Sequence, residues 1–339
     1  MSLCEPNLRP YESLTCFYTS QPVEQLLSST NVLAVISSGE PNSQVQDPRH
    51  FHCGLGALDR AQEQLQEVFY SDVPVATGIE HGVRWSRNKD MLIAALWMDA
   101  CDSRDLRQAG RDAYQRLLRF VIAEGYPQII RMWNYLPDIN RGEGDDEGYR
   151  QFCQGRQEAF YETRYPREAF PAACALGHHG DGSVIYLLAG KSAPLHIENP
   201  RQESAYNYPR QYGPASPSFA RAGLVHWPVG SQLYLSGTAS IVGHQSRHIN
   251  NLAGQLQTTF DNIDSLLAQA KQQASLAASP VPDLLKVYVR HAADYQQVAD
   301  SVNSRFPGVS TLYLQADICR RELLVEIDGM CNQLPRTRA

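Results

Sequence analysis

The chain has 339 residues, of which 43% are hydrophobic and 19% are charged, so it is long enough to form two globular domains. Its formal net charge of −6 argues against a nucleic acid or an anionic membrane as partner, because both attract basic proteins. No apolar run approaches the ~18 residues that a membrane span needs, and no secretory signal pattern opens the chain. We therefore expect a cytoplasmic protein.

Strands and helices alternate along the first half of the chain. Buried-strand and helical patterns predict a strand at 31–37, a short amphipathic helix at 57–70, two strands within 83–100 joined by a turn at 87–90, a helix at 105–125 and a strand within 126–140. Gly125 is a suitable residue to end the helix before it.

The second half repeats this order. It predicts strands at 172–177, 183–190 and 231–243, a long helix at 249–273, a strand at 284–291, a helix at 294–306, and strands at 310–317 and 323–328. The repetition suggests a diverged duplication of α+β class, with two related domains in which helices pack on one face of a mixed sheet. We place the domains at 1–165 and 166–330, followed by a tail at 331–339.

A glutamate interrupts the last apolar run, LLVEID. In a strand, Glu326 lies on the opposite face from Leu323, Val325 and Ile327, so it points toward water or toward a cleft. A carboxyl group in a dehydrated cleft has a raised pKa and is suited to act as a general acid. Cys319 precedes it by seven positions, and the polar RRE segment between them suggests a hairpin that would bring the two together. A surface carboxylate and a buried structural thiol are the alternatives.

Two further segments offer binding residues. The loop 206–221 combines three tyrosines and two arginines with prolines, a composition suited to a small anionic ligand, although aromatic packing at the surface would also explain it. Asn134 and Tyr135 follow Trp133 at the end of a strand and are plausible site residues.

The histidines and cysteines do not predict a metal site. His244 and His248 have the spacing of helical ligands, and the segment HFHCG places His and Cys together, but no third ligand has a convincing spacing. The eight cysteines form no CxxC pair, and nucleotide-binding and nucleophile-elbow motifs are absent.

The C-terminal half resembles the reactive-intermediate deaminase superfamily in residues 236–267, in 284–307 and in the closing VEID. In that superfamily, trimers bind small carboxylates between subunits, and a glutamate at the position of Glu326 activates water. Thr311 stands where those enzymes carry a carboxylate-binding arginine, which argues against imine hydrolysis.

The whole chain resembles the chorismatase family more specifically. The likeness covers both halves in five motifs in the same order: RMWNYLPDIN, FPAACALG, YNYPRQYGP with SPSFARA, SGTASIVGHQSRH and ADICRRELLVEIDG. It implies two deaminase-like, or chorismate-mutase-like, domains and an enzyme that releases pyruvate from chorismate. One subgroup hydrolyses chorismate to a cyclohexadiene diol, a second forms 3-hydroxybenzoate, and a third, from xanthomonadin pigment synthesis, forms 3- and 4-hydroxybenzoate.

Two positions separate these subgroups. Cys319 stands where the hydrolytic type has alanine, and Gly237 matches the benzoate-forming type. The resemblance therefore implies a 3-hydroxybenzoate synthase, most like the pigment-linked type with two products. A hydrolytic chorismatase, an imine or enamine deaminase and a non-catalytic binding module remain alternatives.

The resemblance also assigns roles. Glu326 protonates the enol-ether methylene, Cys319 moves a proton or steers ring opening, and Gly237 leaves the ring room beside the thiol. No metal, nucleotide or flavin is required. The candidates for holding the substrate are Asn134, Tyr135, Tyr206, Arg210, Tyr212 and Arg221. Two related domains in one chain favour a monomer, because a single chain can enclose a cleft that the trimeric relatives share between subunits.

Overall fold

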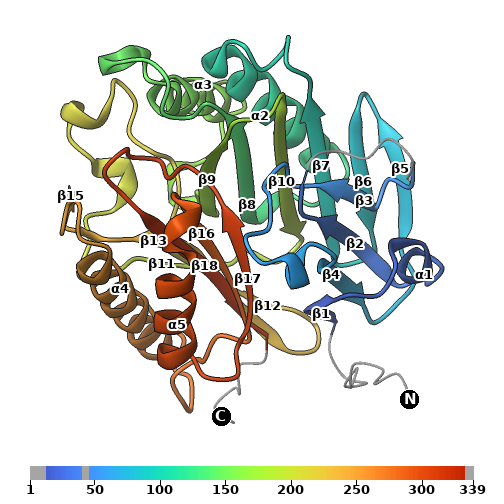
Figure 1. The fold of residues 1–339 in the computed structure, drawn as a ribbon. Helices are drawn as coiled ribbons and strands as arrows, with labels where there is room; N and C mark the ends of the chain where they lie inside the picture. The colour runs from blue at the N-terminus through green and yellow to red at the C-terminus, as the bar shows by residue number, and fades with distance from the viewer. Residues whose placement is uncertain (1–12, 40–45, 333–339) are drawn as a thin grey trace.

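The computed structural model describes residues 13–39 and 46–332, in which three sheets of four or six strands carry helices on their outer faces, and a fourth sheet has only two strands (Figure 1). The N-terminal sheet has the order β1-β4-β2-β3 and comprises β1 (Leu14–Thr19), β2 (Val32–Ser37), β3 (His50–His52) and β4 (Gln66–Ser71). The short helix α1 (Val23–Leu27) packs against it through Leu26.

The first large sheet has six strands in the order β5-β6-β7-β10-β8-β9. Its strands are β5 (Ala76–Glu80), β6 (Val83–Arg87), β7 (Met91–Met98), β8 (Gln128–Pro137), β9 (Ala172–His178) and β10 (Ser183–Gly190). Helices α2 (Leu106–Ala123) and α3 (Gly148–Glu162) cover one face. Asp105 caps α2 by accepting from two backbone N–H groups, and Gly125 ends it with a positive φ of 81°.

The second large sheet also has six strands, in the order β11-β12-β13-β18-β16-β17. Its strands are β11 (Leu195–Ile197), β12 (Ala222–His226), β13 (Ser231–Ala239), β16 (Leu284–Val289), β17 (Ser310–Gln315) and β18 (Val325–Cys331). Helices α4 (Leu252–Gln273) and α5 (Tyr295–Arg305) cover its outer face, and β14 (Ile241–Val242) pairs with β15 (Gln245–Ser246) beside it.

The two large sheets have the same topology. In each, three strands precede a helix, a strand, a second helix or helical segment and two further strands, and the last strand of the unit inserts between the third and the fourth. In each, only the outermost pair is parallel, β8 with β9 and β16 with β17. The expected α+β class and the helices on one face of each sheet are confirmed, and the shared topology is that of a duplication.

The predicted domain boundary at 165/166 cuts through the first large sheet. β9 and β10 follow that boundary, yet β9 pairs with β8, and β10 pairs with both β7 and β8. The sheet is complete only at Gly190, the end of β10, because the last strand of each unit lies in the middle of its sheet. The predicted tail at 331–339 begins one residue early, since Cys331 is the last residue of β18; residues 333–339 lie outside the described part of the chain.

One predicted helix is wrong. Residues 57–70 form a 3-10 turn at Arg60–Gln62 followed by strand β4. The glutamines and glutamates favoured a helix, but Val68 and Phe69 are fully buried in the N-terminal sheet between β1 and β2. Burial of these two apolar side chains outweighs a helix propensity difference of under ~1 kcal/mol per residue.

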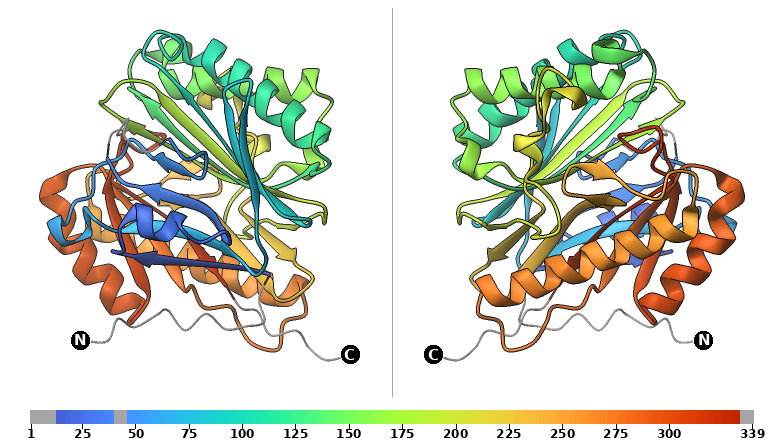
Figure 2. Two further views of the ribbon diagram at one scale, coloured as in Figure 1. Left: turned by 90° about the vertical axis from the view of Figure 1, so that its right-hand side faces the viewer. Right: turned by 90° about the vertical axis from the view of Figure 1, so that its left-hand side faces the viewer.

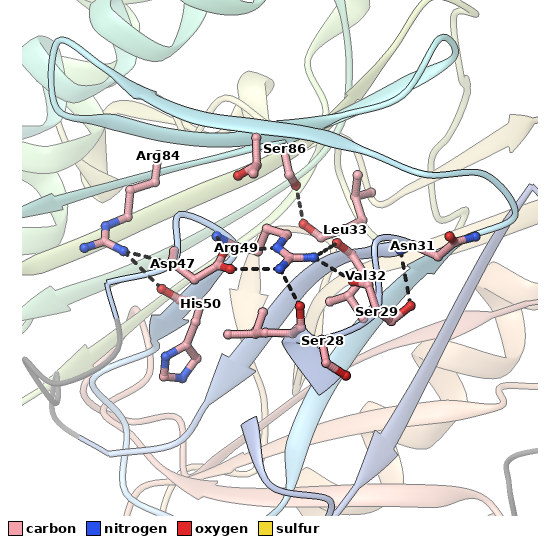
Figure 3. A network of polar contacts seen from close by, with 12 residues as sticks. Ser28, Ser29, Asn31, Val32, Leu33, Asp47, Arg49, His50, Arg84 and Ser86 are labelled. Atoms are coloured by element: carbon pink, nitrogen blue, oxygen red, sulfur yellow. Dashed lines mark hydrogen bonds and ion pairs between the residues drawn. The ribbon is translucent and has the colours of Figure 1, made fainter. Parts of the chain in front are cut away.

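The inner faces of the two large sheets meet in a shared core (Figure 2), to which the N-terminal sheet adds a third wall. Figure 3 shows how that wall is attached: Arg84 donates from β6 to the carbonyl of Asp47, whose carboxylate pairs with Arg49 at 2.8 Å. Ser86 donates to the carbonyl of Leu33 in the same region. Within the described residues, no helix combines the length and the hydropathy of a membrane span.

Candidate active site

A pocket opens at the junction between the two large sheets. It encloses about 780 Å³ including its mouth, and it lies between β9 and α3 of the first unit and β13, β18 and the 198–221 loop of the second. It is lined by Glu147, Tyr149, Arg150, Arg156, Ala173, Cys174, Ala175, Gln202, Tyr208, Tyr212, Pro217, Phe219, Arg221, Gly237, Ala239, Ile241, Cys319, Arg320 and Glu326. Both units of the duplication therefore contribute to it.

Glu326 projects into this pocket from the centre of the second large sheet. Its strand neighbours are Ala239 on β13 and Tyr288 on β16, while Val325 and Ile327 point to the opposite face, toward α4 and α5. The predicted alternation is thus confirmed for Val325 and Ile327, whereas Leu323 precedes β18 and packs in the core between the sheets. The side to which Glu326 points is a cleft. Glu326 is only 4% exposed. Burial, and then the negative charge of Asp328, raise the pKa of Glu326 to about 8.

Gly237 makes room for this carboxyl group. A Cβ atom at position 237 would fall well inside contact distance of Glu326 Oε1 and 3.1 Å from Cβ of Cys174. The backbone of β13 can pass this close only because the residue lacks a side chain. The structure thus gives Gly237 a role that the sequence did not suggest, which is to accommodate the glutamate.

Cys319 lies in the same pocket, in the loop between β17 and β18. The expected hairpin is not formed, because β16 separates the two strands in the sheet. A turn closed by the hydrogen bond from Leu323 N to the carbonyl of Arg320, at 3.1 Å, brings the loop back over the end of β18. Burial, and then the proximity of Glu326, raise the pKa of the Cys319 thiol, so the thiol is protonated at neutral pH.

Two of the four residues predicted from the tyrosine- and arginine-rich loop, Tyr212 and Arg221, line the pocket, and Tyr208, Pro217 and Phe219 of the same loop join them. Arg221 is 4% exposed and donates from Nη2 to the carbonyl of Glu203 at 2.8 Å and to the hydroxyl of Tyr208 at 2.7 Å. The hydroxyl of Tyr212 is hydrogen-bonded to Nδ1 of His244 at 3.0 Å, and the guanidinium of Arg320 lies 4.0 Å from its ring centre.

Two other residues of this loop lie outside the pocket. Tyr206 packs against Phe170, with the guanidinium of Arg167 4.7 Å from its ring centre. Arg210 points to solvent and forms an ion pair with Asp145 at 2.6 Å. The 3-10 turns at Ala205–Asn207 and Arg210–Tyr212 rotate successive side chains away from one another, so composition alone could not show which ones face inward.

The two β8 residues also lie behind the pocket wall. Asn134 faces α2, where it accepts from the hydroxyl of Tyr114 at 2.9 Å and donates to the carbonyl of Cys174 at 2.7 Å. Tyr135 faces the core between the sheets, and its hydroxyl is hydrogen-bonded to that of Tyr288 at 3.0 Å. Both are fully buried and support the site from outside the pocket.

The sequence reasoning missed the contribution of α3. Arg156 is 1% exposed, donates from Nη2 to Sγ of Cys153 at 3.5 Å and leaves its Nε without a hydrogen-bond partner in the protein. Tyr149 and Arg150 reach the pocket from the same helix. The helical pattern of residues 148–162 is weak, and nothing in the sequence indicates that Arg156 would face the second unit.

The pocket combines a neutral acid with buried positive charge. Arg156 and Arg221 form no ion pair with any carboxylate of the described residues, and the Nε atom of each lacks a partner. Buried guanidinium groups require a counter-charge or hydrogen-bond acceptors. The arrangement therefore suits a small ligand with carboxylate groups that receives a proton from Glu326.

No group of three histidine, cysteine, aspartate or glutamate side chains that could hold a metal ion occurs within residues 13–39 and 46–332. His244 instead contacts Tyr212.

Comparison with known proteins gives matches over most of the chain. Residues 67–189 match the family described as "Chorismatase FkbO/Hyg5-like, N-terminal", a range that ends one residue before the end of β10. A 3-hydroxybenzoate synthase of Streptomyces hygroscopicus is 36% identical over 281 residues, which cover 79% of this chain and 82% of that protein. A chorismatase of the same organism is 34% identical over 328 residues, 93% of each chain.

A solved structure shares the fold. The crystal structure of a chorismatase at 1.08 Å resolution superposes with a TM-score of 0.85 at 31% sequence identity, covering 95% of this chain and 99% of the other.

Proposed function

Because the chain belongs to the chorismatase family and is an enzyme that acts on chorismate, we propose that it converts chorismate to 3-hydroxybenzoate and pyruvate, with 4-hydroxybenzoate as a second product. The observation that carries this proposal is Glu326, a carboxyl group that stays protonated at neutral pH inside a pocket with two buried arginines. Chorismate carries two carboxylates and an enol ether, so it requires both features.

The first step is a proton transfer. Glu326 delivers its proton to the methylene carbon of the enol ether, and the ether carbon becomes an oxocarbenium ion. A carboxyl group with an ordinary pKa would be ionised at pH 7 and could not donate. Burial of Glu326 and the nearby charge of Asp328 supply the protonated form.

The second step releases pyruvate and forms the aromatic ring. The ring hydroxyl loses its proton and bonds to the adjacent ring carbon as the bond from that carbon to the ether oxygen breaks, so pyruvate leaves and an arene oxide forms. One C–O bond of the oxide then opens, its oxygen takes up a proton, and the ring carbon that keeps the oxygen loses its own proton to give hydroxybenzoate, with no net consumption of water. Glu326, now ionised, can accept the released proton. In this proposal Cys319, a neutral thiol that lines the same pocket, steers the opening of the arene oxide.

The substrate carboxylates bind to arginines in this proposal. Arg156 from α3 and Arg221 from the loop before β12 enter the pocket from different units, and each has an unused Nε–H. Guanidinium groups bind carboxylates with paired hydrogen bonds. Tyr212 and Arg320 lie beside them at the mouth.

The positions of two residues support the benzoate-forming reaction over hydrolysis of chorismate to the diol. Cys319 and Gly237, the two residues that distinguish the subgroups, both line the pocket next to Glu326.

Thr311, at the position where deaminases carry an arginine, lies on the edge strand β17, and its hydroxyl donates to the carbonyl of Val309 at 3.2 Å. This position does not support imine hydrolysis.

The proposal is tested by incubating the purified protein with chorismate in D₂O and following the products by NMR. We expect pyruvate that carries one deuteron in its methyl group, together with 3-hydroxybenzoate. Absence of pyruvate would overturn the proposal.

A further inference from the structure

A buried ion pair lies behind Glu326 and has no place in the reaction as described so far. Asp328 follows Glu326 by two residues on β18, lies on the same face and is likewise 4% exposed. Arg131, 1% exposed, reaches it from β8 of the other large sheet with an Nη2 to Oδ2 distance of 2.7 Å. The pair therefore bridges the two units beside the catalytic strand.

Further polar groups surround this pair. The hydroxyl of Tyr288 donates to the same Oδ2 atom of Asp328 at 2.9 Å and is hydrogen-bonded to Tyr135. Both donors fix the position of the Asp328 side chain. Next to it, Lys286 pairs with Glu67 of the N-terminal sheet at 2.8 Å, and in the strand register Lys286 stands opposite Asp328.

Stabilisation of the folded state does not explain why this ion pair is buried here. Buried ion pairs are often no more stabilising than apolar residues of similar volume, because both charges lose their hydration. Here the desolvation is also incompletely offset, since Nη1 of Arg131 has no hydrogen-bond partner in the protein. The surrounding residues belong to the apolar core between the sheets, which an apolar pair would also fill.

The position of Asp328 relative to Glu326 explains the presence of the ion pair better. Residues two apart on a strand are separated by about 7 Å, so the carboxylate of Asp328 opposes the development of a second negative charge on Glu326. The charged and titratable groups that face Glu326 are Asp328 on β18, Arg131 on β8, Arg221 before β12, Cys174 on β9, Tyr288 on β16 and Cys319 in the 316–324 loop. Among these, Asp328 is the one group that carries a negative charge.

We propose that the Arg131–Asp328 ion pair is a positioning element of the active site, which keeps Glu326 in the protonated form that the reaction needs. Arg131 holds the aspartate in place within the core, and the carboxylate of Asp328 opposes ionisation of Glu326 more strongly than the positive charge of Arg131 favours it. The inference rests on the proposed function, because it assigns the pair to the acid that starts that reaction.

The test compares the pH dependence of kcat/KM in Asp328→Asn with the wild type. Loss of the aspartate charge leaves Arg131 facing Glu326, so the pH at which kcat/KM falls on the alkaline side should decrease by one to two units. At pH 8, kcat/KM should therefore be roughly five- to fiftyfold lower than in the wild type. Glu67→Gln is the matched control. It removes a carboxylate from the neighbouring buried pair, and we expect the midpoint to stay within about 0.3 unit of the wild type.

The double variant Arg131→Met/Asp328→Asn guards against misfolding, because it leaves neither charge unpaired. Its midpoint should lie between those of the wild type and Asp328→Asn. The titration of Glu326 can also be followed directly by NMR of protein labelled with ¹³C at the glutamate carboxyl carbon, with the resonance identified by its loss in Glu326→Gln.

The NMR titration does not depend on turnover, so it separates the two claims. A wild type that releases no pyruvate would refute the proposed function, while the resonance would still report on the ion pair. An unchanged Glu326 midpoint in folded Asp328→Asn, or in the double variant, would overturn the inference.

Discussion

The backbone of Gly237 lies against the carboxyl group of Glu326, so closely that even a methyl group at position 237 would collide with Oε1. The glycine of β13 and the glutamate of β18 thus form one unit, in which the first residue provides the space that the second occupies. This contact predicts that a side chain at position 237 would displace the Glu326 carboxyl group.

Gly237→Ala should displace the Glu326 carboxyl group and lower kcat by roughly a hundredfold, since a misplacement of about 1 Å costs that much in catalysis. The measurement is steady-state pyruvate release, with circular dichroism to verify the fold. Gly56→Ala is the matched control, because a Cβ there meets no atom within 4 Å. Full activity in Gly237→Ala would show that Glu326 has other room to occupy.

Glu326→Gln should lower kcat by about 10²- to 10⁴-fold, the usual contribution of a general acid. In the wild type, kcat/KM should fall tenfold per pH unit above pH 8, because the active form is protonated and its pKa is about 8. A profile that rises through pH 8 would instead indicate that Glu326 acts as a base.

The same pKa predicts a change in stability. The pKa of Glu326 is higher in the folded state than its ordinary value of 4.5, so its contribution to stability is complete below pH 4.5 and is lost as the pH rises through 8. Thermal unfolding should therefore show Glu326→Gln to be more stable than the wild type at pH 9 and similar to it at pH 4. Equal differences in Tm at both pH values would contradict the assignment.

Cys319→Ala should shift the products from hydroxybenzoate toward the hydrolytic diol, because removal of the thiol leaves space for water beside the intermediate. Separation of the products by chromatography gives the ratio. Cys101→Ala is the control, since that cysteine is exposed and lies outside the pocket. An unchanged ratio in Cys319→Ala would remove the thiol from the mechanism.

Arg156→Met should raise KM for chorismate by roughly ten- to a hundredfold, since a hydrogen bond to a charged group contributes about 1.5–3 kcal/mol. Methionine keeps most of the buried volume. Arg156→Lys should recover part of the loss by restoring the charge.

Arg210→Gln provides the matched control for an arginine of the same region that lies outside the pocket. Its side chain is 65% exposed in its ion pair with Asp145, and exposed pairs contribute little, so we expect KM within about twofold of the wild type. A large effect of Arg210→Gln with none of Arg156→Met would reverse the assignment of the carboxylate site.

The elements that sequence could predict are those whose signal is local. Alternation in LLVEID predicted the face on which Glu326 lies, and the helical spacing with Gly125 predicted α2. The residues that it could not place depend on contacts between the two units. Arg156 belongs to a helix of the first unit but lines a pocket shared with the second, and no periodicity encodes that. Tyr206 and Tyr212 are six residues apart in one loop, yet only the turns between them decide which faces inward.

The domain boundary failed for a topological reason. β10 returns to the centre of its sheet after a chain reversal that the order of strands and helices does not reveal, so the first unit extends to Gly190.

The most direct test of the central claim is the product profile from chorismate, measured by chromatography for the wild type and for Glu326→Gln. We predict that the wild type forms hydroxybenzoate and pyruvate in equal amounts, with 3-hydroxybenzoate among the aromatic products, and that Glu326→Gln forms both about 10²- to 10⁴-fold more slowly. Release of pyruvate with the cyclohexadiene diol as the only other product, or unimpaired turnover by Glu326→Gln, would contradict it.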